Sequence, residues 1–173
     1  MTAAPRSLSI GPPQAGERER LDAILPRFLL EMRLADHDSG ETTFLVARLG
    51  DKPVGSVVVR WNADGDEYEG LPAVPVIEGL DVAERHRGHG IGSALMDAAE
   101  RLATERAHDR VVLSVALDND GARRLYERRG YRDLGLGPRL LSWTFTDDSG
   151  VERSEGDICT WLESPPLLES PPL

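Results

Sequence analysis

The chain has 173 residues with a formal net charge of −10, and 40% of its residues are hydrophobic while 29% are charged. This length fits one domain whose core is large enough to be stable without disulfides. Such an acidic chain is a poor general binder of nucleic acids or anionic membranes, although its surface attracts cations. Cys159 is the only cysteine, which excludes an internal disulfide and a thiolate metal cluster.

Hydrophobic periodicity and turn residues predict alternating strands and helices along the chain. In chain order, we predict a strand at 7–10, a helical region at 21–32, a polar loop at 34–40, hairpin strands at 43–49 and 54–61, an acidic loop at 62–73, a strand at 74–82, a helix from 91 to about 108, a strand at 111–117, a short helix ending before Gly130, and a last hairpin at 140–146 and 157–162.

Two of these segments carry further detail. Apolar residues from Leu21 to Met32 recur at spacings of three and four and predict one helical face, which Pro26 divides into two helices or one kinked helix. The nearly continuous apolar run at 111–117 is typical of a strand buried on both faces of a sheet.

A glycine-rich turn connects the strand at 74–82 to the helix that begins at about Ile91. Gly88, Gly90 and Gly92 allow tight backbone conformations and leave the amides uncovered. These amides lie at the positive end of a helix, with Arg85 and Arg87 beside them. The pattern predicts a site for phosphate or pyrophosphate.

The sequence predicts no metal site. His86 and His89 lie three residues apart without a third ligand nearby, so we interpret them as the cationic rim of the phosphate site. The carboxylates of the loop at 62–73 have a spacing that fits no EF-hand and predict a solvated surface.

Two motifs, in order and separated by a helix and a strand, resemble those of the GNAT superfamily of N-acetyltransferases. The loop pattern Arg/Gln-x-x-Gly-x-Gly/Ala matches Arg87-Gly-His-Gly90-Ile-Gly92. The pattern Asn-x-x-Ala-x-x-Leu-Tyr-x-x-x-Gly-Phe/Tyr matches residues 119–131 at every fixed position. The resemblance is sharpest over residues 77–131, and the N-terminal elements agree with the family only in their order.

The resemblance implies an α/β (α+β) fold, with a central mixed, mostly antiparallel sheet of six to seven strands. About four helices would flank the sheet, which would be splayed between its fourth and fifth strands. One acetyltransferase domain would occupy residues 1–163. The sequence Leu-Glu-Ser-Pro-Pro-Leu occurs at 162–167 and again at 168–173, and its paired prolines predict a Pro-rich tail over residues 164–173.

The function that the resemblance implies is transfer of the acetyl group of acetyl-CoA to a primary amine of a small molecule or peptide, by direct attack in a ternary complex. Acetyl-CoA would be the co-substrate, without a metal, and neither nucleic acid nor membrane would be a partner; a homodimer is compatible with the family. The chain has no apolar leader or membrane-spanning run, which predicts a cytoplasmic protein. The alternative is a non-catalytic acyl-CoA-binding sensor or interaction module with this fold.

The resemblance also assigns site residues. Tyr126 would protonate the departing CoA thiolate, which a phenol within hydrogen-bond reach can do. Contacts to the cofactor would come from Leu80, Val82, Arg87, Gly88, His89, Gly90, Ile91, Gly92, Ser93, Asn119 and Tyr126.

The attacking amine must lose a proton, and Glu78 is the candidate base because half-burial in a strand would raise its pKa. Asp81 is the second candidate, and strand alternation places it on the face opposite to Glu78 unless a bulge intervenes. Glu78 could instead bind the ammonium of the acceptor or form a structural salt bridge, and a water could replace a single base. The acidic segments 34–40 and 147–156 favour a cationic acceptor such as an aminoglycoside or a polyamine.

Overall fold

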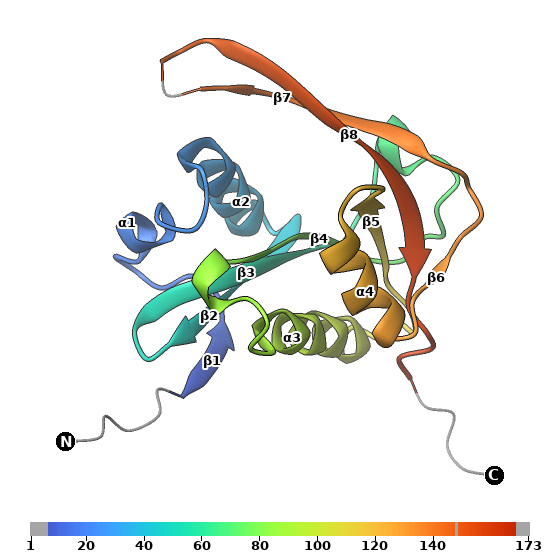
Figure 1. The fold of residues 1–173 in the computed structure, drawn as a ribbon, viewed down its shortest axis with the longest axis horizontal. Helices are drawn as coiled ribbons and strands as arrows, with labels where there is room; N and C mark the ends of the chain where they lie inside the picture. The colour runs from blue at the N-terminus through green and yellow to red at the C-terminus, as the bar shows by residue number, and fades with distance from the viewer. Residues whose placement is uncertain (1–6, 148, 169–173) are drawn as a thin grey trace.

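Eight strands and four α-helices alternate along the chain in the computed structural model, which describes residues 7–147 and 149–168 (Figure 1). Their bounds are β1 Leu8–Gly11, α1 Arg18–Leu21, α2 Arg27–Ser39, β2 Thr42–Leu49, β3 Lys52–Arg60, β4 Val76–Val82, α3 Ile91–Glu105, β5 Val112–Ala116, α4 Asp120–Arg128, β6 Arg132–Asp133, β7 Arg139–Thr146 and β8 Glu152–Glu163. Short 3₁₀ turns, η1 at Asp66–Tyr68 and η2 at Glu84–His86, lie on either side of β4.

The strands form one sheet in the order β1-β2-β3-β4-β5-β8-β6, and β7 pairs with the outer part of β8. Neighbouring strands are antiparallel except for β4 and β5, which are parallel. The predicted fold class, a mixed and mostly antiparallel sheet, is therefore confirmed. The sheet has eight strands, one more than the predicted range, because the two residues of β6 also pair with β8 and are too short to show a period.

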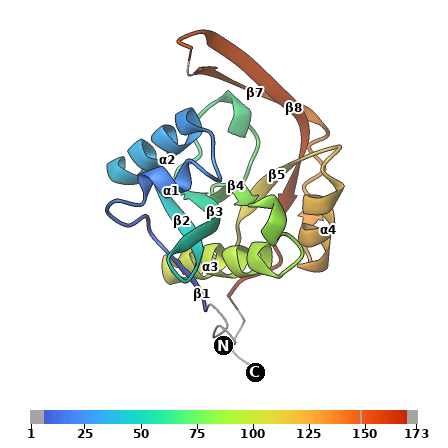
Figure 2. The ribbon, with the colours of Figure 1, turned by 60° about the vertical axis from the view of Figure 1, so that its left-hand side comes forward.

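The helices cover both faces of the sheet, with α1 and α2 on one face and α3 and α4 on the other (Figures 1 and 2). Strand alternation explains this arrangement, because neighbouring valines of β3 point to opposite faces. Val57 lies in a core cluster with Leu95 of α3, whereas Val58 packs in a separate cluster with Leu30 of α2. The strand β5 is buried on both faces, as its apolar run predicted: Val112 and Leu113 belong to different clusters.

The region of α1 and α2 agrees with one prediction and contradicts two. Pro26 separates the helices and immediately precedes α2, as the two-helix alternative predicted. The polar loop predicted at 34–40 is wrong, since α2 continues to Ser39. The helix is capped by Gly40, which has the left-handed conformation with φ of 84°. Met32 is 52% exposed while Leu30 is fully buried, because the break at Pro26 changes the phase of the helical face.

The sheet separates between β4 and β5. These strands pair only at Val76 with Val112 and at Ile77 with Leu113, and then diverge. From Glu78 to Val82, no described strand lies on the β5 side of β4, so its backbone groups are available to a ligand on that side. The predicted splay between the fourth and fifth strands is confirmed.

The outer halves of β7 and β8 form a curved two-stranded arm that arches over α2 (Figures 1 and 2). The rings of Phe28 on α2 and Phe145 on β7 stack with their centroids 4.0 Å apart, which ties the arm to the helix. The strand β8 begins at Glu152 rather than at 157, so part of the acidic segment 147–156 is strand.

The start of the predicted tail packs against the body. The amide of Val111 donates to Ser164 Oγ at 3.1 Å, and the amide of Leu167 donates to the carbonyl of Asp109 at 2.7 Å. Residues 169–173 lie outside the described residues, and the domain boundary after residue 163 stays a prediction. Across the described ranges, no helix combines the length and apolar character that crossing a bilayer requires.

Candidate active site

A bulge in the middle of β4 decides where its two carboxylates point. In the register with β3, Val58 faces Glu78 and Ser56 faces Asp81, so β4 has one extra residue between them. Gly79 takes up the bulge with φ of 55°, a conformation that suits glycine. Because Ser56 and Val58 share one face of β3, Glu78 and Asp81 also share a face, toward α2. Opposite faces were expected only if no bulge intervened, and the bulge that the sequence left open is present.

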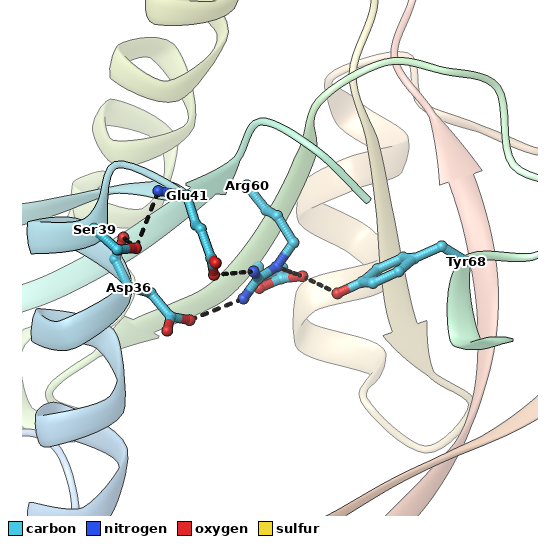
Figure 3. Close-up of polar contacts among 6 residues, drawn as sticks. Asp36, Ser39, Glu41, Arg60 and Tyr68 are labelled. Atoms are coloured by element: carbon cyan, nitrogen blue, oxygen red, sulfur yellow. Dashed lines mark hydrogen bonds and ion pairs between the residues drawn. The ribbon is translucent and has the colours of Figure 1, made fainter. Parts of the chain in front are cut away.

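Glu78 contacts a cluster of charged and polar side chains, of which Asp36, Glu41, Arg60 and Tyr68 are labelled in Figure 3. Its Oε1 accepts hydrogen bonds from Tyr68 Oη at 2.6 Å and from Arg60 Nε at 3.1 Å, while Arg60 Nη2 donates to Asp36 Oδ2 at 3.1 Å. Burial and the charge of Glu78 raise the pKa of Tyr68. Burial alone would lower the pKa of Arg60. The charge and hydrogen bond of Glu78, together with Tyr68 and Asp36, outweigh burial, so the pKa of the guanidinium is raised. The salt bridge that the sequence left open for Glu78 is present, and its role as a base stays a prediction.

Asp81 has a different environment. Its Oδ2 lies 2.9 Å from Nη2 of the buried Arg33, in an ionic contact that lacks the alignment of a hydrogen bond. Arg33 Nη1 donates to Ser56 Oγ at 3.1 Å. A Cβ atom at Gly79 would come within 2.6 Å of Arg33 Cζ, so the glycine of the bulge also makes room for this arginine. The carboxylate of Asp81 remains 43% exposed and can meet a ligand.

The glycine-rich loop after β4 fits an anion. Arg87 Nε donates to the carbonyl of Val82 at 2.9 Å and closes the loop on the strand. Gly88 and Gly90 have φ of 74° and 81°, and a Cβ on either would meet no atom within 4 Å. Within the described residues, the amides from Gly88 to Ser93 donate to no backbone carbonyl. Free amides at the start of α3 are suited to an anion, and the phosphate site at this loop stays a prediction.

His86 adds little positive charge to this loop beyond the arginines. Desolvation and the charges of Arg85 and Lys52 lower the pKa of His86, so its neutral form is favoured. His89 Nδ1 lies 2.8 Å from the carbonyl of Arg87. The permanent cations of the rim are therefore Arg85 and Arg87. Where the structure describes the chain, no group of three or more His, Cys, Asp or Glu side chains could hold a metal ion.

The helix α4 carries the remaining predicted residues. Asn119 caps the helix, because its Oδ1 accepts a hydrogen bond from the amide of Ala122 at 3.1 Å. Tyr126 is only 6% exposed and packs at 5.8 Å from the ring of Tyr131. Burial and the charge of Asp81 raise the pKa of Tyr126 to about 12. The phenol is thus protonated at neutral pH, and Asp81 lies near enough to influence it.

The comparisons with known proteins agree with this geometry. The model of the acetyltransferase (GNAT) family matches residues 11–143, which is most of the chain. This chain belongs to the GNAT acetyltransferase family. The glycine-rich loop, the separated strands and Tyr126 all lie within the matched residues.

Individual relatives are more distant. Over 73 residues, or 42% of this GNAT chain, the sequence is 36% identical to the mycothiol acetyltransferase of Corynebacterium aurimucosum, and the match covers 22% of that relative. An N-acetyltransferase from Staphylococcus aureus Mu50 superposes with a TM-score of 0.67 at 12% identity, over 94% of this chain and 99% of that one. A GNAT acetyltransferase from Elizabethkingia anophelis with acetyl-CoA bound gives 0.59 at 19% identity, over 91% and 97%.

Two neighbouring cavities lie where β4 ends in this GNAT chain. The first, about 510 Å³, opens beside Asp81 and Arg87. The second, about 560 Å³, extends from there to the turn between β2 and β3. They share three lining residues, which are Ala23, Ile24 and Arg85. A molecule on the α1 side of β4 can therefore reach Asp81.

Three polar residues of the site were missed by the sequence analysis: Arg33, Arg60 and Tyr68. Their partners are distant in sequence, so local spacing could not identify them. A signal was present for Arg60, because it ends an apolar run, and a charge there requires a partner. Tyr68 lies in the acidic loop and had no such signal.

Proposed function

We propose that this chain transfers the acetyl group of acetyl-CoA to a primary amine of a small molecule or peptide by direct attack in a ternary complex. The observation that carries the proposal is the set of free amides from Gly88 to Ser93 at the start of α3, beside the gap between β4 and β5. Membership of the GNAT family supports it.

The chain offers contacts along the length of the co-substrate, which supplies the activated acetyl thioester. The amides from Gly88 to Ser93 would bind the pyrophosphate, with the guanidinium of Arg87 nearby. The backbone of Leu80 and Val82, unpaired on the β5 side, would bind the pantetheine arm. The Oδ1 of Asn119 is engaged as a helix cap, so its amide nitrogen is the group that would contact the arm.

Tyr126 would donate its proton to the departing thiolate. Its raised pKa, about 12, keeps the phenol protonated over the working pH range. Burial excludes water, which strengthens a hydrogen bond to a developing negative charge. Within the described residues, no hydrogen bond to another protein group occupies its hydroxyl.

The proton of the attacking amine would be taken by a carboxylate of β4, directly or through a water. Asp81 is half-exposed, lines the first cavity and influences Tyr126 electrostatically. Glu78 is the base that the sequence predicted, but Arg60 and Tyr68 both occupy its Oε1. These contacts favour Asp81 as the proton acceptor and Glu78 as a residue that attracts the ammonium group.

The acceptor is tested by thiol release. The protein is mixed with acetyl-CoA and a panel of a monoamine, a polyamine, an aminoglycoside and a short peptide, and CoA release is measured together with CoA affinity. We expect release that depends on one class of amine, with cations preferred because Asp36, Glu41 and Glu78 outnumber Arg60 in their cluster. CoA binding without release over the whole panel would favour the sensor, and absence of CoA binding would contradict both functions.

A further inference from the structure

Three cationic side chains gather around the larger of the two cavities, on the α1 side of the glycine-rich loop. Arg20 comes from α1, Lys52 from the start of β3 and Arg85 from η2. The cavity has a volume of about 560 Å³. Three elements that are separate in sequence thus bring positive charge to one place in a chain whose net charge is −10.

These cations have little opposing charge. None of the three forms an ion pair among residues 7–147 and 149–168, and Asp51 is the carboxylate among the lining residues. Arg20 Nη1 donates to the backbone carbonyl of Asp51 at 3.2 Å, which orients the guanidinium at the rim. Arg20 also lies near the carboxylate of Glu17, but that group is bound by Arg48 at 2.6 Å.

The walls between the charges are apolar. The alkyl parts of Ala23, Ile24, Leu49 and Pro53 line the cavity together with Gly50. The positive charge also affects the neighbouring His86, whose pKa is lowered by desolvation and by the charges of Arg85 and Lys52. The combination of apolar walls and cations suits an anion carried on an organic molecule.

We propose that the cavity lined by Arg20, Lys52 and Arg85 is a binding site for the phosphate group of an organic phosphate ester, separate from the loop amides at Gly88–Ser93. Two arginines supply planar donors for phosphate oxygens, and the lysine adds a point charge. The phosphate could belong to the 3′-phosphate of CoA held at the adjoining loop or to a second molecule. If the phosphate is that of CoA, the site rests on the proposed function and deepens it; if it belongs to a second molecule, the site does not depend on acetyl transfer.

Lys52 provides a direct reporter, because it is the only lysine in the chain. Reductive methylation with ¹³C-formaldehyde gives its side chain one dimethylamine resonance and keeps the positive charge. The resonance is followed by NMR during titration with inorganic phosphate, with CoA and with 3′-dephospho-CoA. We expect a saturable shift with phosphate that is weakened at high salt.

The titrations also separate the two sources. A shift with CoA but not with 3′-dephospho-CoA assigns the site to the 3′-phosphate of the cofactor. A shift with phosphate that persists in the presence of saturating CoA assigns it to a second molecule. If neither phosphate nor CoA produces a saturable shift, the proposal is overturned, whether or not the protein releases CoA in the transfer assay.

The variants Arg20→Gln and Arg85→Gln test the other two cations. Each removes a charge-assisted contact and should weaken phosphate binding about three- to tenfold. Arg101→Gln is the matched control, since Arg101 is exposed on α3 and pairs only loosely with Glu105 at 3.8 Å. Equal phosphate affinity in all three variants and the parent protein would contradict the proposed site.

Discussion

The two ends of β4 differ in how their charged and polar groups are satisfied. In the first half of the strand, Glu78 contacts Arg60 and Tyr68, and Arg60 also contacts Asp36. These residues form a closed set of hydrogen bonds and ion pairs, of which Arg60, Asp36 and Tyr68 are labelled in Figure 3. From Asp81 onward the carboxylate is half-exposed, the loop amides have no backbone acceptor, and two cavities open. One strand thus has a closed end and an open end.

This difference separates groups that support the fold from groups that can bind a ligand. Removing a member of a closed set leaves its partners desolvated and unpaired, so the loss is expected in stability. The free loop amides contribute little to stability, and they are available to a substrate. Asp81 is available through its exposed part, but it also pairs with the buried Arg33. The following changes test this division, beginning with the largest expected effect.

At the open end, Tyr126→Phe should lower kcat about a hundredfold, because a general acid contributes at least that much to such reactions. The affinity for acetyl-CoA should stay unchanged, since the ring is retained. The control is Tyr131→Phe, which removes the hydrogen bond from the neighbouring buried tyrosine to Glu100 at 2.9 Å. Steady-state kinetics and calorimetry distinguish the outcomes, and a wild-type rate in the Tyr126 variant would remove this residue as the acid.

The loop is tested by Gly90→Val. A side chain at φ of 81° strains the backbone and covers the amides, so acetyl-CoA affinity should fall about thirtyfold. Gly135→Val is a matched control, because Gly135 has φ of 73° and equally open surroundings but lies in the loop before β7. Both variants should lose similar stability in thermal denaturation. Calorimetry that shows equal loss of CoA affinity in both would contradict the assignment of the loop.

The two carboxylates of β4, Asp81 and Glu78, allow the most direct test of which residue takes the proton of the amine. Asp81→Asn should lower kcat about tenfold, which is less than a direct general base contributes, because a water can also take the amine proton. The same change removes a negative charge near Tyr126, so the pKa of that phenol should fall from about 12, while burial keeps it above its ordinary value. NMR of ¹³Cζ-labelled tyrosine measures this shift. Glu78→Gln leaves Arg60 and Tyr68 without their acceptor, so it should lower stability as well as raise KM more than it lowers kcat. A larger loss of kcat in Glu78→Gln than in Asp81→Asn would return Glu78 to the role of base.

Much of the fold could be predicted from sequence, because its signals are local. The apolar stripe of α3 and the glycines before Ile91 fixed the start of that helix. The helical residues 34–39 were missed because polar residues on an exposed helical face resemble a loop. The bulge at Gly79 had a signal, since an isolated glycine in a strand indicates a bulge, but its position relative to β3 required the register.

The site was predictable only in part, for a related reason. The loop amides are contiguous in sequence, and the GNAT motifs named Asn119 and Tyr126 as candidates, whose roles stay predictions. The contacts that hold Glu78 and Asp81 come from α2, β3 and η1, which are far apart in the chain. Whether a carboxylate is engaged or available depends on those contacts. Local spacing could therefore name both carboxylates but could not rank them.

The closed end is tested by Arg60→Gln, for which we expect the smallest effect. The change leaves the partly buried Asp36 and Glu78 without their cation, which should cost about 1 kcal/mol of unfolding free energy. The pKa of Arg60 is raised above an already high value, so its charge and its contribution persist from about pH 5 to about pH 9. Urea denaturation at both limits measures this, with Arg101→Gln as the exposed control. Unchanged stability together with a large loss of kcat would mean that the cluster acts in catalysis, and the division between the two ends of β4 would fail.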